Sequence, residues 1–199
     1  MKDIITRKVI KPHDCALALS IPTTRAAFFE ALEKPENRDF IPNLHPVWPK
    51  YNHEVIKYTN RLLPAINSLG VDVFRDASLA DFKALLSRQQ HSVIILFAHW
   101  KDDSVEFADG LALFPSIVEA VPYSYQGFID LCVCHPMSLA MELRNARPAC
   151  VVRFTNAEAT PALWLYFYLA LFKLLQESRI TYLSALETTI HEFLKSGRE

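Results

Sequence analysis

A histidine and a cysteine stand at the ends of two apolar segments that have the composition of buried strands. His99 follows residues 93–98 (VIILFA), and Cys134 ends residues 128–134 (FIDLCVC). A thiolate beside an imidazole is the minimum for nucleophilic acyl transfer: the imidazole takes up the thiol proton and later protonates the leaving amine, while the sulfur forms the covalent intermediate. Cys134 also precedes a predicted helix, whose positive N-terminal end favours a thiolate and whose N–H groups can hold an oxyanion. We therefore take His99 and Cys134 as a candidate catalytic dyad.

The same residue types allow two other interpretations. A His after one strand and a Cys in another occur together by chance in many α/β proteins. Cys132 and Cys134 share one side of their strand, and with His135 they form a C-x-C-H corner that could contribute to a metal site. A tetrahedral site needs further ligands, and the chain has no C-x-x-C or H-x-x-x-H partner for this corner. With four glycines and no phosphate-loop motif, we expect neither a metal nor another cofactor.

Apolar runs alternate with segments of helical period along the chain, which indicates an α/β domain with a largely parallel sheet. Strands are predicted at 14–21, 71–75, 93–98, 104–109, 128–134 and 150–155. Helices are predicted at 24–34, 52–69 with a bend or new start near Pro64, 79–88, 114–121, 137–146, 161–176 and 183–196. In such a sheet, ligands bind at the carboxyl ends of the strands, where His99 and Cys134 are expected to lie.

The composition describes one globular domain and argues against several classes of partner. The chain has 199 residues, of which 51% are hydrophobic, and its formal net charge is −1, so we expect no disorder and no electrostatic footprint for nucleic acid or a membrane. The most apolar stretch, residues 162–175 (ALWLYFYLALFKLL), is shorter than the roughly 20 residues of a membrane span. Four cysteines, three of them in apolar runs, fit a reducing compartment, and no secretory signal is recognised at the N-terminus. We expect a cytoplasmic protein.

Residues 71–194 resemble the caspase-like cysteine peptidases of clan CD, and among them the CHAT type. The segment VDVFRDASLADFKALLSRQQHSVIILFAHW looks like their strand, helix and strand that end in the catalytic His. VEFADGLALFPSIVEAVP resembles the following hairpin and helix, and FIDLCVCHPMSLAMELRNARPACVV is similar to the strand that carries the nucleophile. LYFYLALFKLLQESRITYLSALETTIHEFLK looks like the two closing helices. The resemblance implies a caspase-like three-layer α/β sandwich, with residues 1–70 as an N-terminal part and 71–199 as the region of the dyad.

By this resemblance His99 and Cys134 are catalytic, and the backbone N–H groups of Trp100 and Cys134 form the oxyanion hole. The chain departs from the family at two positions. Trp100 follows His99 where the family normally has Gly, and its Cβ restricts the backbone of that loop. His135 follows Cys134 where small or polar residues are more usual. A divergent peptidase and a fold that has lost activity are both compatible with these departures.

The resemblance also implies a substrate pocket and partners. Asp130 and Cys132 lie on the strand face of the nucleophile, where an acid often receives the residue before the scissile bond, so a basic residue would suit Asp130. The alternative for Asp130 is an ion pair with Arg153 on a nearby strand. The implied activity is that of a cysteine endopeptidase acting on a protein or peptide substrate, in bacterial defence or regulated proteolysis, under control of a separate protein. The alternative is a catalytically inactive caspase-like module that binds a protein partner.

Overall fold

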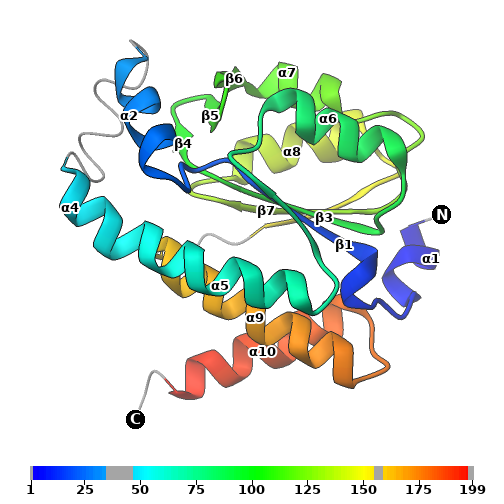
Figure 1. Ribbon diagram of the computed structural model, residues 1–199. Coiled ribbons are helices and arrows are strands. Elements are labelled where there is room, and N and C mark those ends of the chain that lie inside the picture. Colours follow the sequence, from blue (N-terminus) through cyan, green and yellow to red (C-terminus); the bar gives the residue numbers. More distant parts are fainter. Residues whose placement is uncertain (1, 35–46, 155–158, 197–199) are drawn as a thin grey trace.

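A five-stranded parallel sheet forms the centre of the protein (Figure 1). The computed structural model describes residues 2–34, 47–154 and 159–196. The strand order is β2-β1-β3-β7-β8, and every neighbouring pair is parallel. The strands are β1 (Cys15–Leu19), β2 (Asp72–Arg75), β3 (Val93–Ala98), β7 (Phe128–Val133) and β8 (Val151–Phe154). The predicted α/β class and the mostly parallel sheet are therefore confirmed.

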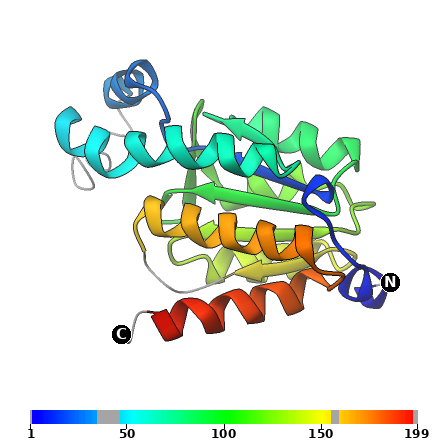
Figure 2. The ribbon, with the colours of Figure 1, turned by 60° about the horizontal axis from the view of Figure 1, so that its bottom comes forward.

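Helices cover both faces of this sheet, which makes the protein a three-layer sandwich (Figures 1 and 2). One face carries α6 (Leu79–Arg88), α7 (Phe114–Ala120) and α8 (Met137–Ala146). The other carries α5 (Lys57–Ser68), α9 (Pro161–Glu177) and α10 (Tyr182–Ser196). Shorter helices complete the described chain: α1 (Lys2–Arg7), η1 (Pro12–Asp14), α2 (Arg25–Glu33), α4 (Trp48–Tyr51) and η3 (Asn52–Ile56).

Strand side chains alternate between two apolar cores, one on each face of the sheet. Along β7, Phe128 and Cys132 belong to the core under α5, α9 and α10, whereas Ile129 and Leu131 belong to the core under α6, α7 and α8. All six residues of β3, the middle strand, are buried. A strand covered on both faces is a continuous apolar run, because neither set of alternating side chains meets water. The central strand predicted from VIILFA therefore occupies the predicted place.

An antiparallel three-stranded sheet follows β3 directly. Its strands are β4 (Trp100–Lys101), β5 (Ser104–Phe107) and β6 (Gly110–Leu113), in that order. Gly110 has φ 132°, a value that side chains rarely tolerate, and it begins β6. The sequence predicts one strand at 104–109 with a turn at Gly110; the structure has the turn at 108–109 and a strand after it.

The helical segment before β2 differs from the sequence prediction. Pro64 lies inside α5 without ending it, and the irregularity comes earlier, in the π-helical turn η3. The helical segment begins before the predicted residue 52, with Trp48 in α4. Residues 35–46, which the sequence predicts as part of an ordered loop that ends at Pro49, lie outside the described residues. Gly70 has φ 99° and ends this helical segment as predicted.

Candidate active site

His99 and Cys134 are the residues that directly follow two neighbouring, in-register strands. β3 and β7 pair in parallel up to Ala98 opposite Val133, so the next residue on each strand is His99 and Cys134, respectively. Adjacent strands in a sheet lie about 4.8 Å apart. The register therefore brings the backbones of the two candidate catalytic residues side by side at the carboxyl edge of the sheet. Both residues are partly exposed, as a reacting pair must be.

Hydrogen bonds to two other strands fix the backbone at the end of β3. The Ser20 N–H donates to the Phe97 carbonyl at 2.9 Å, and the Ser20 hydroxyl donates to the Glu106 carbonyl at 2.7 Å. The Glu106 N–H donates to the His99 carbonyl at 2.9 Å. His99 is thus held by β5 on one side, and β5 is held by the end of β1 on the other. A candidate acid/base group gains from such support, because its position then does not depend on the loop that follows it.

The Trp100 amide faces away from β5. In an antiparallel ladder, directly opposite pairs alternate between those that exchange hydrogen bonds and those that do not. The bond from the Glu106 N–H to the His99 carbonyl places His99 opposite Glu106 as a bonded pair, so the next pair, Trp100 opposite Val105, is of the other type. The N–H of Trp100 is consequently outside this ladder. The role of this amide as an oxyanion donor stays a prediction.

Cys134 lies in a tight turn between β7 and α8. The next residue, His135, has φ 47°, in the left-handed region that costs a residue with a side chain of order 1 kcal/mol or more. Pro136 then forms the N-cap of α8 and provides no side-chain cap to the helix. The ten-residue helix α8 therefore begins three residues after Cys134. A helix N-terminus favours the thiolate over the thiol.

The rings of Trp100 and His135 contact each other beside the dyad. Their centroids are 5.1 Å apart and their planes are inclined by 55°. Trp100 is partly buried and also packs against the core under α6, α7 and α8. The two residues at which the chain departs from the caspase-like pattern are therefore in mutual contact. This contact connects the start of β4 with the turn before α8.

Asp130 is fully buried two residues upstream of Cys132. Its Oδ1 accepts a hydrogen bond from Arg153 Nη1 at 2.7 Å, and its Oδ2 accepts from the hydroxyls of Tyr182 at 2.7 Å and Tyr168 at 3.3 Å. The ion pair with Arg153, one of the two roles expected for Asp130, is thus observed. Sequence reasoning missed the two tyrosines because they belong to α9 and α10. The contribution of Asp130 to substrate binding stays a prediction, and we leave it out of the site proposed below.

Buried charge and buried hydroxyls in this group have strongly shifted pKa values. Burial, followed by the Asp130 carboxylate, raises the pKa of the Tyr168 and Tyr182 hydroxyls, so both remain donors. Burial lowers the pKa of Arg153, but Asp130 outweighs it and the net shift is upward. Cys132 is 4% exposed in the core beneath α9, where burial raises the pKa of its thiol. Because the structure places Cys132 in the interior, we leave it out of the proposed substrate contacts as well.

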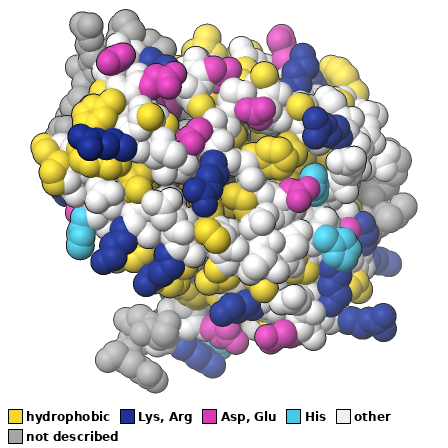
Figure 3. Space-filling model, in the orientation of Figure 1, with side chains coloured by type: hydrophobic (Ala, Val, Ile, Leu, Met, Phe, Trp, Pro, Cys, Tyr) yellow, Lys and Arg dark blue, Asp and Glu magenta, His cyan; other side chains and the backbone are white. Residues whose placement is uncertain are grey.

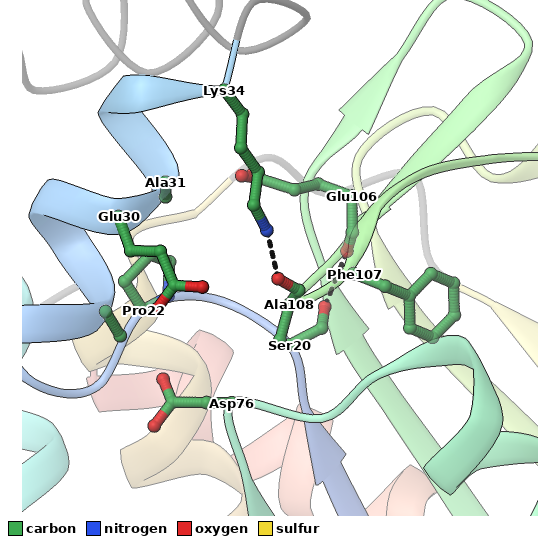
Figure 4. Close-up of a pocket in the computed structure, with 10 residues that line it drawn as sticks. Ser20, Pro22, Glu30, Ala31, Lys34, Asp76, Glu106, Phe107 and Ala108 are labelled. Carbon is green, nitrogen blue, oxygen red and sulfur yellow. Dashed lines mark hydrogen bonds between the residues drawn. The ribbon is translucent and has the colours of Figure 1, made fainter.

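A cavity of about 220 Å³ opens between α2 and the β5–β6 hairpin (Figure 4). Its walls come from four separate parts of the chain, which no local motif connects. It is lined by Ser20, Pro22, Ala27, Glu30, Ala31, Lys34, Asp76, Glu106, Phe107 and Ala108. The only signal of it in the sequence is an acidic residue, Glu106, within the otherwise apolar strand pattern SVEF.

Glu106 is the deepest charged group of this cavity. Its exposed fraction is 2%, and burial raises its pKa to about 7, with Lys34 acting in the opposite direction. A carboxyl group with a pKa near 7 changes its charge under physiological conditions. The group is attached through its own backbone N–H to His99, so the cavity and the candidate dyad share one support.

Comparison with models of known protein families and with curated proteins finds no match to this chain. Among the residues that the structure describes, no helix is both long and apolar enough to cross a membrane. Within the same residues, no group of three or more His, Cys, Asp and Glu side chains is arranged to hold a metal ion. None of the four cysteines forms a disulfide. Cys134 is the only one of the four that is not buried.

Proposed function

We propose that the protein is a cysteine endopeptidase in which Cys134 is the nucleophile and His99 the general acid/base. The observation that carries the proposal is the register of β3 and β7, which aligns the two residues at the ends of adjacent strands. The partial exposure of Cys134, the left-handed turn after it and the start of α8 support the same role. Strained backbone of this kind gathers at functional sites.

The proposed reaction proceeds through an acyl-enzyme. His99 takes the proton from Cys134 Sγ, and the sulfur attacks the scissile carbonyl carbon. The resulting oxyanion is held by the backbone N–H groups of Trp100 and Cys134. The C–N bond then breaks and His99 gives its proton to the leaving amine. In the second half, His99 takes a proton from water, the hydroxide attacks the thioester, and the carboxylic acid leaves as Sγ regains the proton.

We further propose that the fold is of the caspase-like kind and that the substrate is a protein or peptide. The five-stranded order, the hairpin that follows the His-bearing strand and the helix that follows the Cys-bearing strand support this. A plain doubly wound α/β domain does not require a hairpin between β3 and α7. The fold by itself is compatible with many activities, so the dyad rather than the architecture has to be tested.

The test uses Cys134→Ala and His99→Ala separately, against a peptide library and with a peptidyl thiol-alkylating probe. Each substitution should abolish cleavage, and the probe should label Cys134 in the wild-type protein. Two matched controls remove the same groups elsewhere: Cys15→Ala at the opposite end of the sheet, and His53→Ala on an exposed helical position. Both controls should cleave at the wild-type rate after correction for the folded fraction. A Cys134→Ala protein with undiminished cleavage would refute the assignment.

A non-enzymatic binding module is the second candidate, and the Trp100–His135 ring contact favours it. Two rings held together beside the strand ends provide a partly apolar surface for a partner. The two candidates differ in what Cys134→Ala does. A binding module retains its partner after this substitution and loses it with Trp100→Ala, whereas an endopeptidase loses turnover with the first.

A further inference from the structure

Two neighbouring helices on one face of the sheet, α5 and α9, carry positive charge and, along almost all of their length, no negative charge. The helices pack against each other, and their exposed cations are Lys57 and Arg61 on α5 and Lys173 on α9. Neither α5, nor α9 before its last residue, Glu177, contains Asp or Glu. In Figure 3, basic side chains gather over the lower half of the view, where Figure 1 places these two helices, and most acidic side chains lie over the upper half.

The Arg61 guanidinium is held by the rings of two tyrosines, one from each helix. Its Cζ lies 5.4 Å from the centroid of the Tyr58 ring and 5.4 Å from that of the Tyr166 ring. The two rings meet edge to face, with their centroids 6.2 Å apart. A guanidinium is attracted to ring faces, and this attraction restricts its movement. Arg61 is therefore positioned before any partner arrives, so that less conformational entropy is lost on binding.

The charges of Lys57, Arg61 and Lys173 are not neutralised by groups of the protein. Within the part of the chain that the structure describes, none of the three side chains forms an ion pair or donates a hydrogen bond. Glu54, the acidic residue one turn before Lys57, is no exception. A contact with a ring face leaves the N–H donors of a guanidinium available, and a carboxylate accepts two of them at once. The arrangement therefore favours an anion with oxygen acceptors.

The three cations are spaced along the helices at intervals that suit an extended chain. Helices α5 and α9 run in the same direction (Figure 2), and the ring contact of Tyr58 with Tyr166 places these two residues at about the same level. With a rise of about 1.5 Å per residue, Arg61 lies about 4.5 Å and Lys173 about 10.5 Å beyond this level, and Lys57 about 1.5 Å before it. The cations thus follow one another at about 6 Å along the helix axes. Alternate residues of an extended chain are about 6.6 Å apart.

We propose that this basic face docks an extended acidic segment of a partner protein, with carboxylates on alternate residues of the segment. The basic face consists of Lys57, Tyr58, Arg61, Tyr166 and Lys173. Successive carboxylates on one side of the segment would meet successive cations of the face, and the charge complementarity would direct the partner to it. The face lies across the sheet from α8, the helix that follows Cys134, so the proposal is independent of the peptidase function.

An acidic protein segment fits the basic face better than a nucleic acid or a membrane does. Nucleic-acid binding depends on the neutralisation of many phosphates, whereas the face offers three cations on a chain with a net charge of −1. A helix that lies on a membrane presents a broad apolar side, whereas the large apolar side chains exposed on the described α5 and α9 are Leu163 and Tyr166. Carboxylates spaced along a peptide match both the number and the spacing of the cations.

The test measures binding of the dye-labelled peptide Glu-Thr-Glu-Thr-Glu-Thr amide to the full-length Cys134→Ala protein, whose proposed nucleophile is absent. At about 20 mM NaCl this peptide should bind at least about fivefold more tightly than the same peptide with Gln for each Glu. The difference should shrink at about 500 mM NaCl, because salt screens exposed charges. Arg61→Gln should weaken binding about fivefold. The matched control is Arg88→Gln, an exposed arginine of α6 on the opposite face of the sheet, which should leave binding unchanged.

A second variant and a second peptide test the rings and the spacing. Tyr166→Leu keeps every charge and should weaken binding about two- to threefold after correction for the folded fraction, because Arg61 loses one ring. A peptide with its three Glu residues adjacent to one another should bind less tightly than the alternating one, and equal binding would contradict the proposed register.

Three results would overturn the docking of an acidic segment. The first is equal affinity for the Glu and Gln peptides, or equal effects of Arg61→Gln and Arg88→Gln. The second is tighter, Arg61-dependent binding of a thymidine dodecamer or of vesicles containing phosphatidylserine, which would assign the face to phosphate groups. The third is self-association in sedimentation that Arg61→Gln abolishes, which would assign the face to a second copy of the chain.

Discussion

Replacing Asp130 by Asn tests the buried charge group beneath the nucleophile strand. The substitution keeps the shape of the side chain but leaves Arg153, whose side chain is 13% exposed, without a counter-charge. Removing one partner of a buried ion pair costs about 3–5 kcal/mol, because the remaining charge is desolvated and uncompensated. For a chain of this size such a loss lowers the melting temperature by roughly 6–20 °C. The expected result is a large loss of stability with the fold retained.

The three contacts of Asp130 predict an order among smaller substitutions. Tyr182→Phe removes a hydrogen bond of 2.7 Å to the carboxylate and should cost about 1.5–3 kcal/mol. Tyr168→Phe removes a bond of 3.3 Å and should cost less than Tyr182→Phe, about 0.5–1 kcal/mol. Urea unfolding followed by circular dichroism measures all three variants under the same conditions. If the slope of the free energy of unfolding against urea concentration is the same in all variants, the variants differ in stability and not in the surface exposed on unfolding.

A double variant distinguishes the loss of the Asp130–Arg153 ion pair from the cost of leaving one of its charges buried without a partner. Asp130→Leu combined with Arg153→Met removes both charges, and such apolar replacements of buried pairs are often neutral or stabilising. We expect the double variant to be more stable than Asp130→Asn, although two tyrosine hydroxyls lose their acceptor. The reasoning is refuted if Asp130→Asn costs less than about 1 kcal/mol, or if Tyr168→Phe costs more than Tyr182→Phe.

Two further predictions concern the sheet edge and a close backbone contact. The Glu106 pKa is raised from 4.5 to about 7, so the folded state binds this proton more tightly than the unfolded state, and stability should fall by about 3 kcal/mol as the pH rises from 4.5 to 7 and then level off. Glu106→Gln should flatten this part of the pH profile of urea unfolding. An unchanged profile would mean that another titratable group causes the pH dependence of stability. Gly127→Ala should cost about 1–3 kcal/mol, because the added Cβ would lie 2.4 Å from the Tyr125 hydroxyl and 2.7 Å from the Ser92 carbonyl. A thermal melt within 2 °C of wild type would show that this contact relaxes freely.

The elements predicted well are those with signals inside their own few residues. Ser78 caps α6 and receives the reciprocal contact of Asp81, and the predicted helix has the observed bounds Leu79–Arg88. The apolar run VIILFA has the observed bounds of β3. Pro64 misled the prediction because a proline removes one donor and crowds one turn, but the apolar face of α5 packs against α9 and outweighs that cost.

The parts of the site that sequence reasoning missed consist of residues far apart in the chain. The candidate dyad was predicted because each member ends a recognisable strand. The cavity was not, because Glu30, Asp76 and Glu106 belong to three segments that only the sheet order brings together. The ion pair of Asp130 with Arg153 was one of two alternatives, and the register of β7 with β8 places the two residues directly opposite. The spacing of these two residues along the chain does not indicate that they lie opposite each other.

By itself the sequence determined the class of the fold, the central strand and the positions of the two residues that we propose for acyl transfer. These follow from local physics, since periodicity, capping and the length of apolar runs act over a few residues. Only the tertiary structure decided that β3 and β7 are neighbours in register, that Asp130 is paired with Arg153 inside the protein, and that Glu30, Asp76 and Glu106 line one cavity. Strand order and register depend on which apolar faces bury each other across the whole chain, and that global competition leaves no signature in any single segment.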